Sequence, residues 1–349
     1  MDRKKEQYKK IFNLGSNDLF DTGAKSALYQ SIRRQHRKRR TKRMLSYTAG
    51  IAAALSLFFL FYLQQNSKKT APELNIMYIA RQNEDAIGAA DEMLLISSVN
   101  GRDSSMVNPL NTDGVNTALS LEGHIIPDMD KVPVYSTVYV PYGKRQAFIL
   151  PDKSTAWLNA GSYLTFRNDM SQGTREVYLN GEGYFDIAHN GLPFVVRTAQ
   201  TSINVLGTTF NVNSYEEDSH TTIELLTGSI ALQSTKGLFG EIKMKPGERV
   251  DFDSRQSKIS INRKANGDDI LWTKRQLVLQ RLSIDALARK LERVYNVKIH
   301  LDSQLRALQV AYSGRLNIDV DIVSSLSSLY ELKDYEITQI EKEVWIRKK

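Results

Sequence analysis

The residues best suited to chemistry are scattered along the 349-residue chain. It has five well-separated histidines and no cysteine, which excludes disulfides and thiolate metal sites. No HExxH, GxSxG or phosphate-loop motif occurs, and Gly181-x-Gly183 lacks the third glycine and the following helix of a dinucleotide site. Glu182, between those glycines, has no partner carboxylate, so we interpret it as an edge or turn carboxylate on a hairpin. We expect no metal, no cofactor and no conventional enzymatic site.

The segment that must organise the rest is Met44–Leu63, twenty residues without a charge. As a helix it would span about 30 Å, the thickness of the hydrocarbon core of a bilayer. Eight of the eleven residues 33–43 are Lys or Arg, which predicts a cytoplasmic N-terminus and an outer segment 64–349. A cleaved signal peptide and a buried soluble helix both fit this pattern less well. The sequence therefore predicts a single-pass membrane protein.

The charge of the chain is divided by this span. Residues 1–43 carry 14 basic against 4 acidic side chains, whereas residues 64–349 carry 33 against 35. The basic run fits a topology signal and a contact with anionic lipid. We expect no nucleic-acid binding, because no reading helix or aromatic platform accompanies the run.

The inner tail, residues 1–43, has apolar residues at helical spacing on both sides of a polar stretch. Two short amphipathic helices are predicted, and helices of this length are marginal in water. The tail is either solvated or folds against a cytoplasmic partner, and the pattern leaves both open. In the second case the contact residues would be Tyr8, Ile11, Phe12, Leu28 and Ile32.

The composition and hydrophobic pattern of the outer segment change at two points. Residues 64–131 are polar and predict a linker with one strand at 93–99. Residues 132–262 hold many short β-branched and aromatic runs separated by turn residues, which predicts an all-β domain of the sandwich, barrel or solenoid type. Its strands are expected near 134–140, 146–150, 156–158, 163–166, 176–179, 184–188, 194–197, 202–206, 210–214, 221–226, 229–232, 250–252 and 259–261.

The last part, residues 270–349, contains a short internal repeat. Arg281–Asp285 and Arg315–Asp319 match at an offset of 34 residues, and each lies between a strand-like run and an apolar helical stripe. This predicts a small α+β domain of two βαβ units, with Ser283 and Asn317 as helix N-caps. On the last strand, Trp345 lies opposite the inward Val344 and Ile346, so it could bind a partner by β-augmentation or pack in a second layer.

Five runs of the β region form a recognisable set: VPYGKRQAFILPDKSTAWLNAGSYLTF (140–166), REVYLNGEGYFDIAHNGLPFVV (175–196), INVLGTTFNVNSY (203–215), LTGSIAL (226–232) and PGERV (246–250). These runs resemble the periplasmic domain of FecR-type transmembrane sensors, which are anti-sigma regulators. The residues after Trp272 resemble the C-terminal module of such regulators from Bacteroidetes-type bacteria and are similar to small domains of secretins and TonB-dependent receptors.

The resemblance implies a relay across the bacterial inner membrane. The signalling domain of a TonB-dependent outer-membrane transporter would bind the C-terminal region in the periplasm, and the inner tail would regulate a cytoplasmic sigma factor of the extracytoplasmic-function class. Only residues 24–43 resemble the usual cytoplasmic module, whose tryptophans are absent here. The alternative is a membrane-tethered periplasmic binding or scaffold protein, for example for carbohydrate, without transcriptional output.

The resemblance also implies one chemical event, because some such regulators cut themselves at the Gly-Thr of a VLGT motif. Here that bond is Gly207–Thr208. The Thr hydroxyl would attack the preceding carbonyl to give an ester, which water then opens. The alternative is a strand bend at which only glycine fits.

Overall fold

The computed structural model describes residues 75–88, 90–99, 104–109, 118–121, 124–125, 133–171, 173 and 175–349. They belong to one compact unit, Leu74–Lys349. Within these ranges no helix is both long and apolar enough to cross a bilayer. The predicted span Met44–Leu63 and the inner tail lie outside the described residues.

The segment predicted as a linker contributes regular structure to the β domain, defined here as residues 76–262. It forms α3 (Ile76–Gln82), α4 (Glu84–Gly88), β1 (Leu94–Val99), β2 (Ser104–Pro109) and β3 (Leu119–Ser120). β1 confirms the one predicted strand and pairs with both β2 and β4. The linker prediction is wrong for the rest, because Ile76, Ile79 and Ala80 form a buried face on α3.

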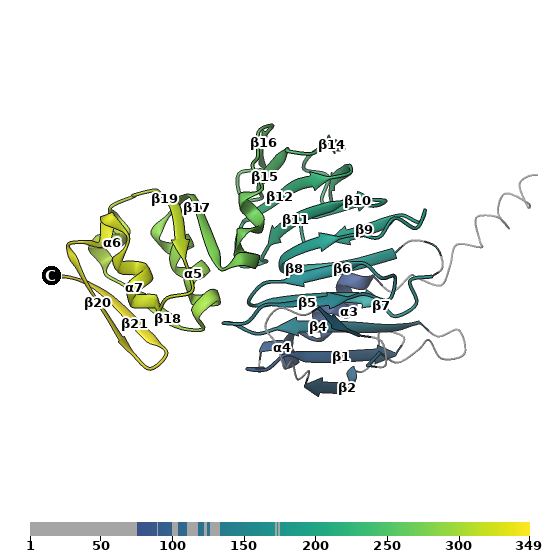
Figure 1. Ribbon diagram of the computed structural model, residues 1–349, viewed down its shortest axis with the longest axis horizontal. Coiled ribbons are helices and arrows are strands. Elements are labelled where there is room, and N and C mark those ends of the chain that lie inside the picture. The colour runs from purple at the N-terminus through teal and green to yellow at the C-terminus, as the bar shows by residue number, and fades with distance from the viewer. Residues whose placement is uncertain are drawn as a thin grey trace, which may run out of the picture. The chain divides into compact units, whose positions relative to one another are not determined.

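The β domain is a curled sheet of mainly antiparallel strands, which confirms its predicted all-β character (Figure 1). Its further strands are β4 (Val134–Val140), β5 (Gln146–Ile149), β6 (Thr155–Leu158), β7 (Ser162–Arg167), β8 (Arg175–Asp186), β9 (Phe194–Arg197), β10 (Thr201–Val205), β11 (Thr209–Ser214), β12 (His220–Thr227), β13 (Ile230–Ser234), β14 (Ile242–Met244), β15 (Arg249–Asp253) and β16 (Lys258–Asn262).

The two halves of this sheet share strand β8. Its first half pairs with β7 and β9, and its second half pairs with β6 and β11. The sequence predicts two strands here, separated by a turn at Asn180-Gly181. The chain instead stays extended, and Gly181, at φ 120°, lets the strand pass Ser162: a Cβ there would lie 2.3 Å from the Ser162 hydroxyl.

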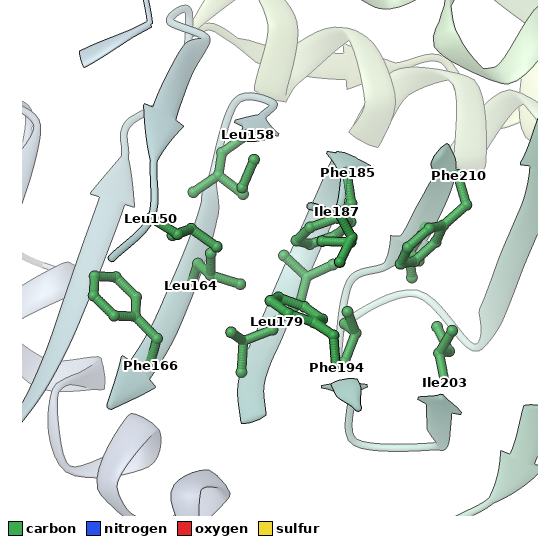
Figure 2. Close-up of a cluster of buried hydrophobic side chains, with 14 of the residues drawn as sticks. Leu150, Leu158, Leu164, Phe166, Leu179, Phe185, Ile187, Phe194, Ile203 and Phe210 are labelled. Carbon is green, nitrogen blue, oxygen red and sulfur yellow. The ribbon is translucent and has the colours of Figure 1, made fainter. Parts of the chain in front are cut away.

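The core of the β domain lies between these two halves. Apolar side chains that alternate along the strands form one buried cluster, to which both halves contribute. Figure 2 shows part of it, with Leu164, Phe166 and Leu179 from one half and Phe185 and Phe210 from the other. The Phe185 and Phe210 rings stack at a centroid distance of 5.3 Å.

The C-terminal domain, residues 276–349, has its own buried cluster. Its elements are β17 (Gln276–Leu282), α5 (Ile284–Tyr295), β18 (Lys298–Leu301), α6 (Ser303–Ala307), β19 (Tyr312–Asn317), α7 (Ile322–Ser327), a 3-10 turn (Tyr330–Leu332), β20 (Tyr335–Ile340) and β21 (Glu343–Lys348). A 3-10 helix, Asp268–Lys274, precedes it. The predicted strands and the two predicted helices occur in the predicted order, and α6 is an additional helix between β18 and β19.

The predicted pairing of the two βαβ units is wrong. Their first strands, β17 and β19, pair antiparallel with each other, whereas β18, β21 and β20 form a separate three-stranded sheet. Ser283 caps α5 as predicted, accepting a hydrogen bond from the Ala286 amide. Asn317 is not a cap, because its side chain accepts from the Asp319 amide and Asp321 caps α7 instead.

Candidate functional site

Of the residues predicted to bind partners, only Trp345 lies in the described part of the chain. Val344 and Ile346 are fully buried and Trp345 is half-buried on the opposite face of its strand, so the predicted alternation is confirmed. The predicted β-augmentation at this strand is wrong, because β21 lies between β18 and β20 and pairs with both. The His300 ring stacks on it at 5.3 Å, and Glu343 contacts the His300 imidazole. Tyr8, Ile11, Phe12, Leu28 and Ile32 lie outside the described residues.

The Gly207–Thr208 bond lies in the connection between β10 and β11. The Thr208 side chain is buried, and its hydroxyl donates to the Ser229 carbonyl at 3.2 Å. Gly207 is required by a close approach, because a Cβ there would lie 2.7 Å from the His189 Nδ1 atom. An exposed imidazole therefore lies beside the peptide that the resemblance marks for cleavage.

A buried arginine holds this connection in place. Arg175 is fully buried and pairs with the Asp152 carboxylate at 2.7 Å. Its guanidinium also donates to the carbonyls of Ala188, Leu192 and Leu206. Because it binds the residue before Gly207 and the residue before His189, Arg175 fixes their separation.

The largest polar site that the sequence did not predict joins the β domain to α5. The Arg293 side chain is 6% exposed and donates to Glu217 and Asp218, each at 2.8 Å. Its guanidinium lies 3.8 Å from the centre of the Tyr215 ring. We call these four residues the docking contact. Arg289, one helical turn earlier, also binds Asp218 at 2.8 Å.

The electrostatics of the docking contact favour its charged form. Burial alone would lower the pKa of Arg293, but Tyr215, Asp218 and Glu217 raise it above its usual value. Burial alone would raise the pKa of Asp218, but Arg293 and Arg289 hold it below its usual value. The pair therefore stays ionised across physiological pH, and each partner has a second opposite charge, Arg289 for Asp218 and Glu217 for Arg293.

A second polar cluster surrounds Trp272, which is 4% exposed in the 3-10 helix between the domains. Its indole donates to Asn211 at 3.1 Å, and Asn211 donates to Glu182 at 3.3 Å. Glu182 also accepts from Asn159 at 2.7 Å and is 3% exposed in the middle of β8. The prediction of Glu182 as an edge or turn carboxylate is therefore wrong.

The same 3-10 helix is fixed by carboxylates. Glu224 accepts from the backbone amides of Gly267 and Asp269 at 2.9 and 3.0 Å. Arg249 binds Asp269 at 2.5 Å. Burial raises the pKa of Asp269 to about 7, Glu224 adds to the shift, and Arg249 opposes it.

The docking contact joins the β domain to α5 of the same chain through charged hydrogen bonds. Among the described residues, no group of three or more His, Asp or Glu side chains could hold a metal ion. The polar side chains here are already paired with one another. The sequence contained one signal for the docking contact: Arg289 and Arg293 stand four apart on α5, and residues 216–218 are three consecutive acids.

Two family models match the chain. Residues 136–231 match the FecR protein model, and residues 276–346 match the model for the C-terminal part of FecR. No curated protein matches the chain.

The fold is similar to that of solved structures. Two crystal structures of a "putative anti-sigma factor" from Parabacteroides distasonis ATCC 8503, at 2.50 and 1.65 Å, align with TM-scores of 0.57 and 0.56. Each is 24% identical to this chain, covers 62% or 61% of it and is itself 99% covered. At this identity the likeness supports the fold.

Proposed function

Because the chain carries both FecR domains in order and belongs to the FecR family, we propose that it is a transmembrane regulator of a cytoplasmic sigma factor. The observation that carries the proposal is the paired match at 136–231 and 276–346. The two similar crystal structures are of a "putative anti-sigma factor", which supports the same role.

The proposed topology is a single pass through the bacterial inner membrane. The uncharged stretch Met44–Leu63 supports the span, and the preceding basic run supports an N-terminus in the cytoplasm. In this arrangement the β domain and the C-terminal domain lie in the periplasm and residues 1–43 meet the sigma factor.

The proposed input is the signalling domain of a TonB-dependent outer-membrane transporter, received by the C-terminal domain. The outer face of its three-stranded sheet supports this, because it presents Trp345 with His300 stacked on it. A half-buried indole on an open sheet face can be covered by a protein partner at little conformational cost.

A two-hybrid assay of residues 1–43 against a small sigma factor encoded beside this gene tests the proposed output. We expect binding that is lost when Leu28 and Ile32 are both replaced by Asp. A scrambled tail of the same composition controls for nonspecific attraction by its net positive charge. Binding by the scrambled tail, or none by the natural tail, would reject the regulator.

We further propose self-cleavage at Gly207–Thr208. The placement of the Thr208 hydroxyl and the His189 imidazole next to this peptide supports it. The hydroxyl oxygen would bond to the Gly207 carbonyl carbon as its proton leaves to His189. The C–N bond would then break with protonation of the Thr208 amine, and water would hydrolyse the ester to a Gly207 carboxylate and a free Thr208 hydroxyl.

A further inference from the structure

One short loop is bound on both of its sides by elements that are far apart in the chain. Residues 215–218, called the acidic loop here, connect β11 to β12 and contain three consecutive carboxylates. On one side Glu217 and Asp218 bind Arg293 of α5, and Tyr215 lies against the same guanidinium. These bonds connect the loop to the C-terminal domain.

On its other side the acidic loop binds the surface that carries α3. The Glu216 carboxylate accepts a hydrogen bond from the Tyr178 hydroxyl at 2.5 Å. It also accepts from Arg81, the last basic residue of α3, at 3.5 Å. The Glu216 amide donates to the Asn180 side chain at 3.1 Å, so side chain and backbone are both held.

Helix α3 is docked on the β domain over the same tyrosine. Ile76, Ala80 and Tyr178 belong to one buried cluster, with Ala80 and Tyr178 fully buried. Glu84 of the next helix accepts from the Tyr163 hydroxyl at 3.0 Å, and the Tyr163 and Tyr178 rings are 6.3 Å apart. Glu216 therefore binds Tyr178, a residue against which α3 packs.

Helix α3 lies close in sequence to the predicted membrane span. It is the first element that the structure describes, and its N-cap Asn75 follows the predicted span Met44–Leu63 by twelve residues. Consecutive Cα atoms are about 3.8 Å apart, so Glu216 cannot keep its geometry if Glu217 and Asp218 are displaced. The ion pairs with Arg293 and the hydrogen bond with Tyr178 are therefore all made by three consecutive residues, 216–218.

We propose that the acidic loop couples the docking of the C-terminal domain to the docking of α3. When α5 is released with both Arg293 and Arg289, Glu217 and Asp218 lose these bonds, the loop moves, and Glu216 loses its bond to Tyr178, which loosens α3. The inference deepens the proposed regulator, because it identifies the residues through which a signal received by the C-terminal domain would reach the membrane-proximal helix.

Site-specific thiol labelling tests the coupling, because the chain contains no cysteine. Ala80→Cys reports undocking of α3, since Ala80 is fully buried. Ala160→Cys reports release of the C-terminal domain: Ala160 is 2% exposed, borders Arg293, and its carbonyl accepts from the Tyr215 hydroxyl. Each reporter is introduced alone into the full-length chain in lipid nanodiscs and labelled with a maleimide.

Arg293→Met is the test variant and Arg315→Met is its matched control. Arg315 forms an ion pair with Asp268 at 2.7 Å but does not touch the acidic loop. We expect Arg293→Met to raise the labelling rate of both reporters by about fivefold or more, the lower range of measured couplings. Arg315→Met should change neither rate.

Coupling is reciprocal, so Tyr178→Phe should raise both rates by a similar factor although it touches only the α3 side. Faster labelling at Ala160→Cys with an unchanged rate at Ala80→Cys would overturn the proposal. If Arg293→Met changes neither labelling rate, the double variant Glu217→Lys with Asp218→Lys forces release of α5 by charge repulsion. The labelling rates of the two reporters are then compared in the same way. The labelling needs no sigma factor, so a negative two-hybrid result leaves this inference standing.

Discussion

The guanidinium of Arg293 lies flat against the Tyr215 ring, 3.8 Å from its centre, while its two terminal nitrogens bind Glu217 and Asp218. One side chain of the C-terminal domain thus contacts three of the four residues of a loop in the β domain. The neighbouring backbone adds a bond, since the Gly143 amide donates to the Arg293 carbonyl at 2.8 Å.

Replacement of Arg293 by Met should weaken the joint between the domains. Asp218 would keep its bond to Arg289 but lose one of its two arginines, so we expect the free energy of unfolding to fall by about 2 kcal/mol. Arg315→Met removes a more exposed pair and should cost less than about 1 kcal/mol. Urea unfolding followed by circular dichroism measures both, and equal effects would contradict a special role for Arg293.

Replacement of Trp272 by Phe should remove one buried hydrogen bond without a large change in packing. The side-chain amide oxygen of Asn211 would lose its hydrogen-bond donor, which should lower the free energy of unfolding by about 1–3 kcal/mol. The same variant should lose the blue-shifted component of the tryptophan fluorescence, because Trp272 is buried while Trp157 and Trp345 are only half-buried. Trp345→Phe is the control and should leave that component and the stability intact.

The 3-10 helix between the domains should respond to pH through Asp269. Its pKa in the folded protein is raised to about 7 from an ordinary value of 3.8, so the folded state favours the protonated form. This stabilisation is complete below pH 3.8 and is lost as the pH rises toward 7, at a cost of up to about 4 kcal/mol.

Urea unfolding at several pH values between 4 and 7.5 measures this effect. Asp269→Asn keeps the side chain neutral and should flatten the pH dependence over this interval. Asp251→Asn is the control, because Asp251 binds the same Arg249 but is more exposed. An Asp269→Asn profile parallel to that of the natural chain would refute the assignment.

Self-cleavage should depend on the Thr208 hydroxyl. We expect full-length natural protein to give two fragments on a denaturing gel, with Thr208 at the new N-terminus. Thr208→Ser should cleave, Thr208→Ala should not, and His189→Ala should slow the reaction by about a hundredfold if the imidazole takes the proton. Thr209→Ala, whose hydroxyl binds Asp186, is the neighbouring control. A single intact band for the natural chain would exclude cleavage.

Trp345→Asp should abolish capture of the full-length chain by an immobilised transporter signalling domain. Charge on the open sheet face would replace the apolar area that a partner covers, whereas Trp345→Phe keeps most of it. The circular dichroism spectrum controls for folding, since Val344 and Ile346 on the other face are untouched. Undiminished capture of the Trp345→Asp variant would show that the binding surface does not include Trp345.

Local sequence patterns predicted the helices and strands better than they predicted which strands pair with each other. The β-branched and aromatic run Val134–Val140 and the cap at Ser283 were visible because they depend on neighbours in sequence. The continuity of β8 through Asn180-Gly181 was not, since an Asn-Gly pair normally signals a hairpin turn and the neighbour that requires this glycine, Ser162, is distant in sequence.

The docking contact was hidden for the same reason. Arg293 is 75 residues from Asp218 and 78 from Tyr215, and nothing in a single sequence links them. Glu182 was misassigned because its partners are distant in sequence: Asn159 follows β6, and Asn211 lies in β11. Side chains that form a buried polar cluster resemble ordinary surface residues until the strands that carry them are paired.

The sharing of β8 between both halves of the sheet has a consequence for how the β domain forms. Its partners β6 and β7 precede it in the chain, while β9 and β11 follow it. Neither half is complete until this one strand has been placed from both directions, so the domain should fold slowly and in one concerted step. A chain that emerges gradually from a membrane would have to wait for residue 214, the end of β11, before β8 had all four of its partners.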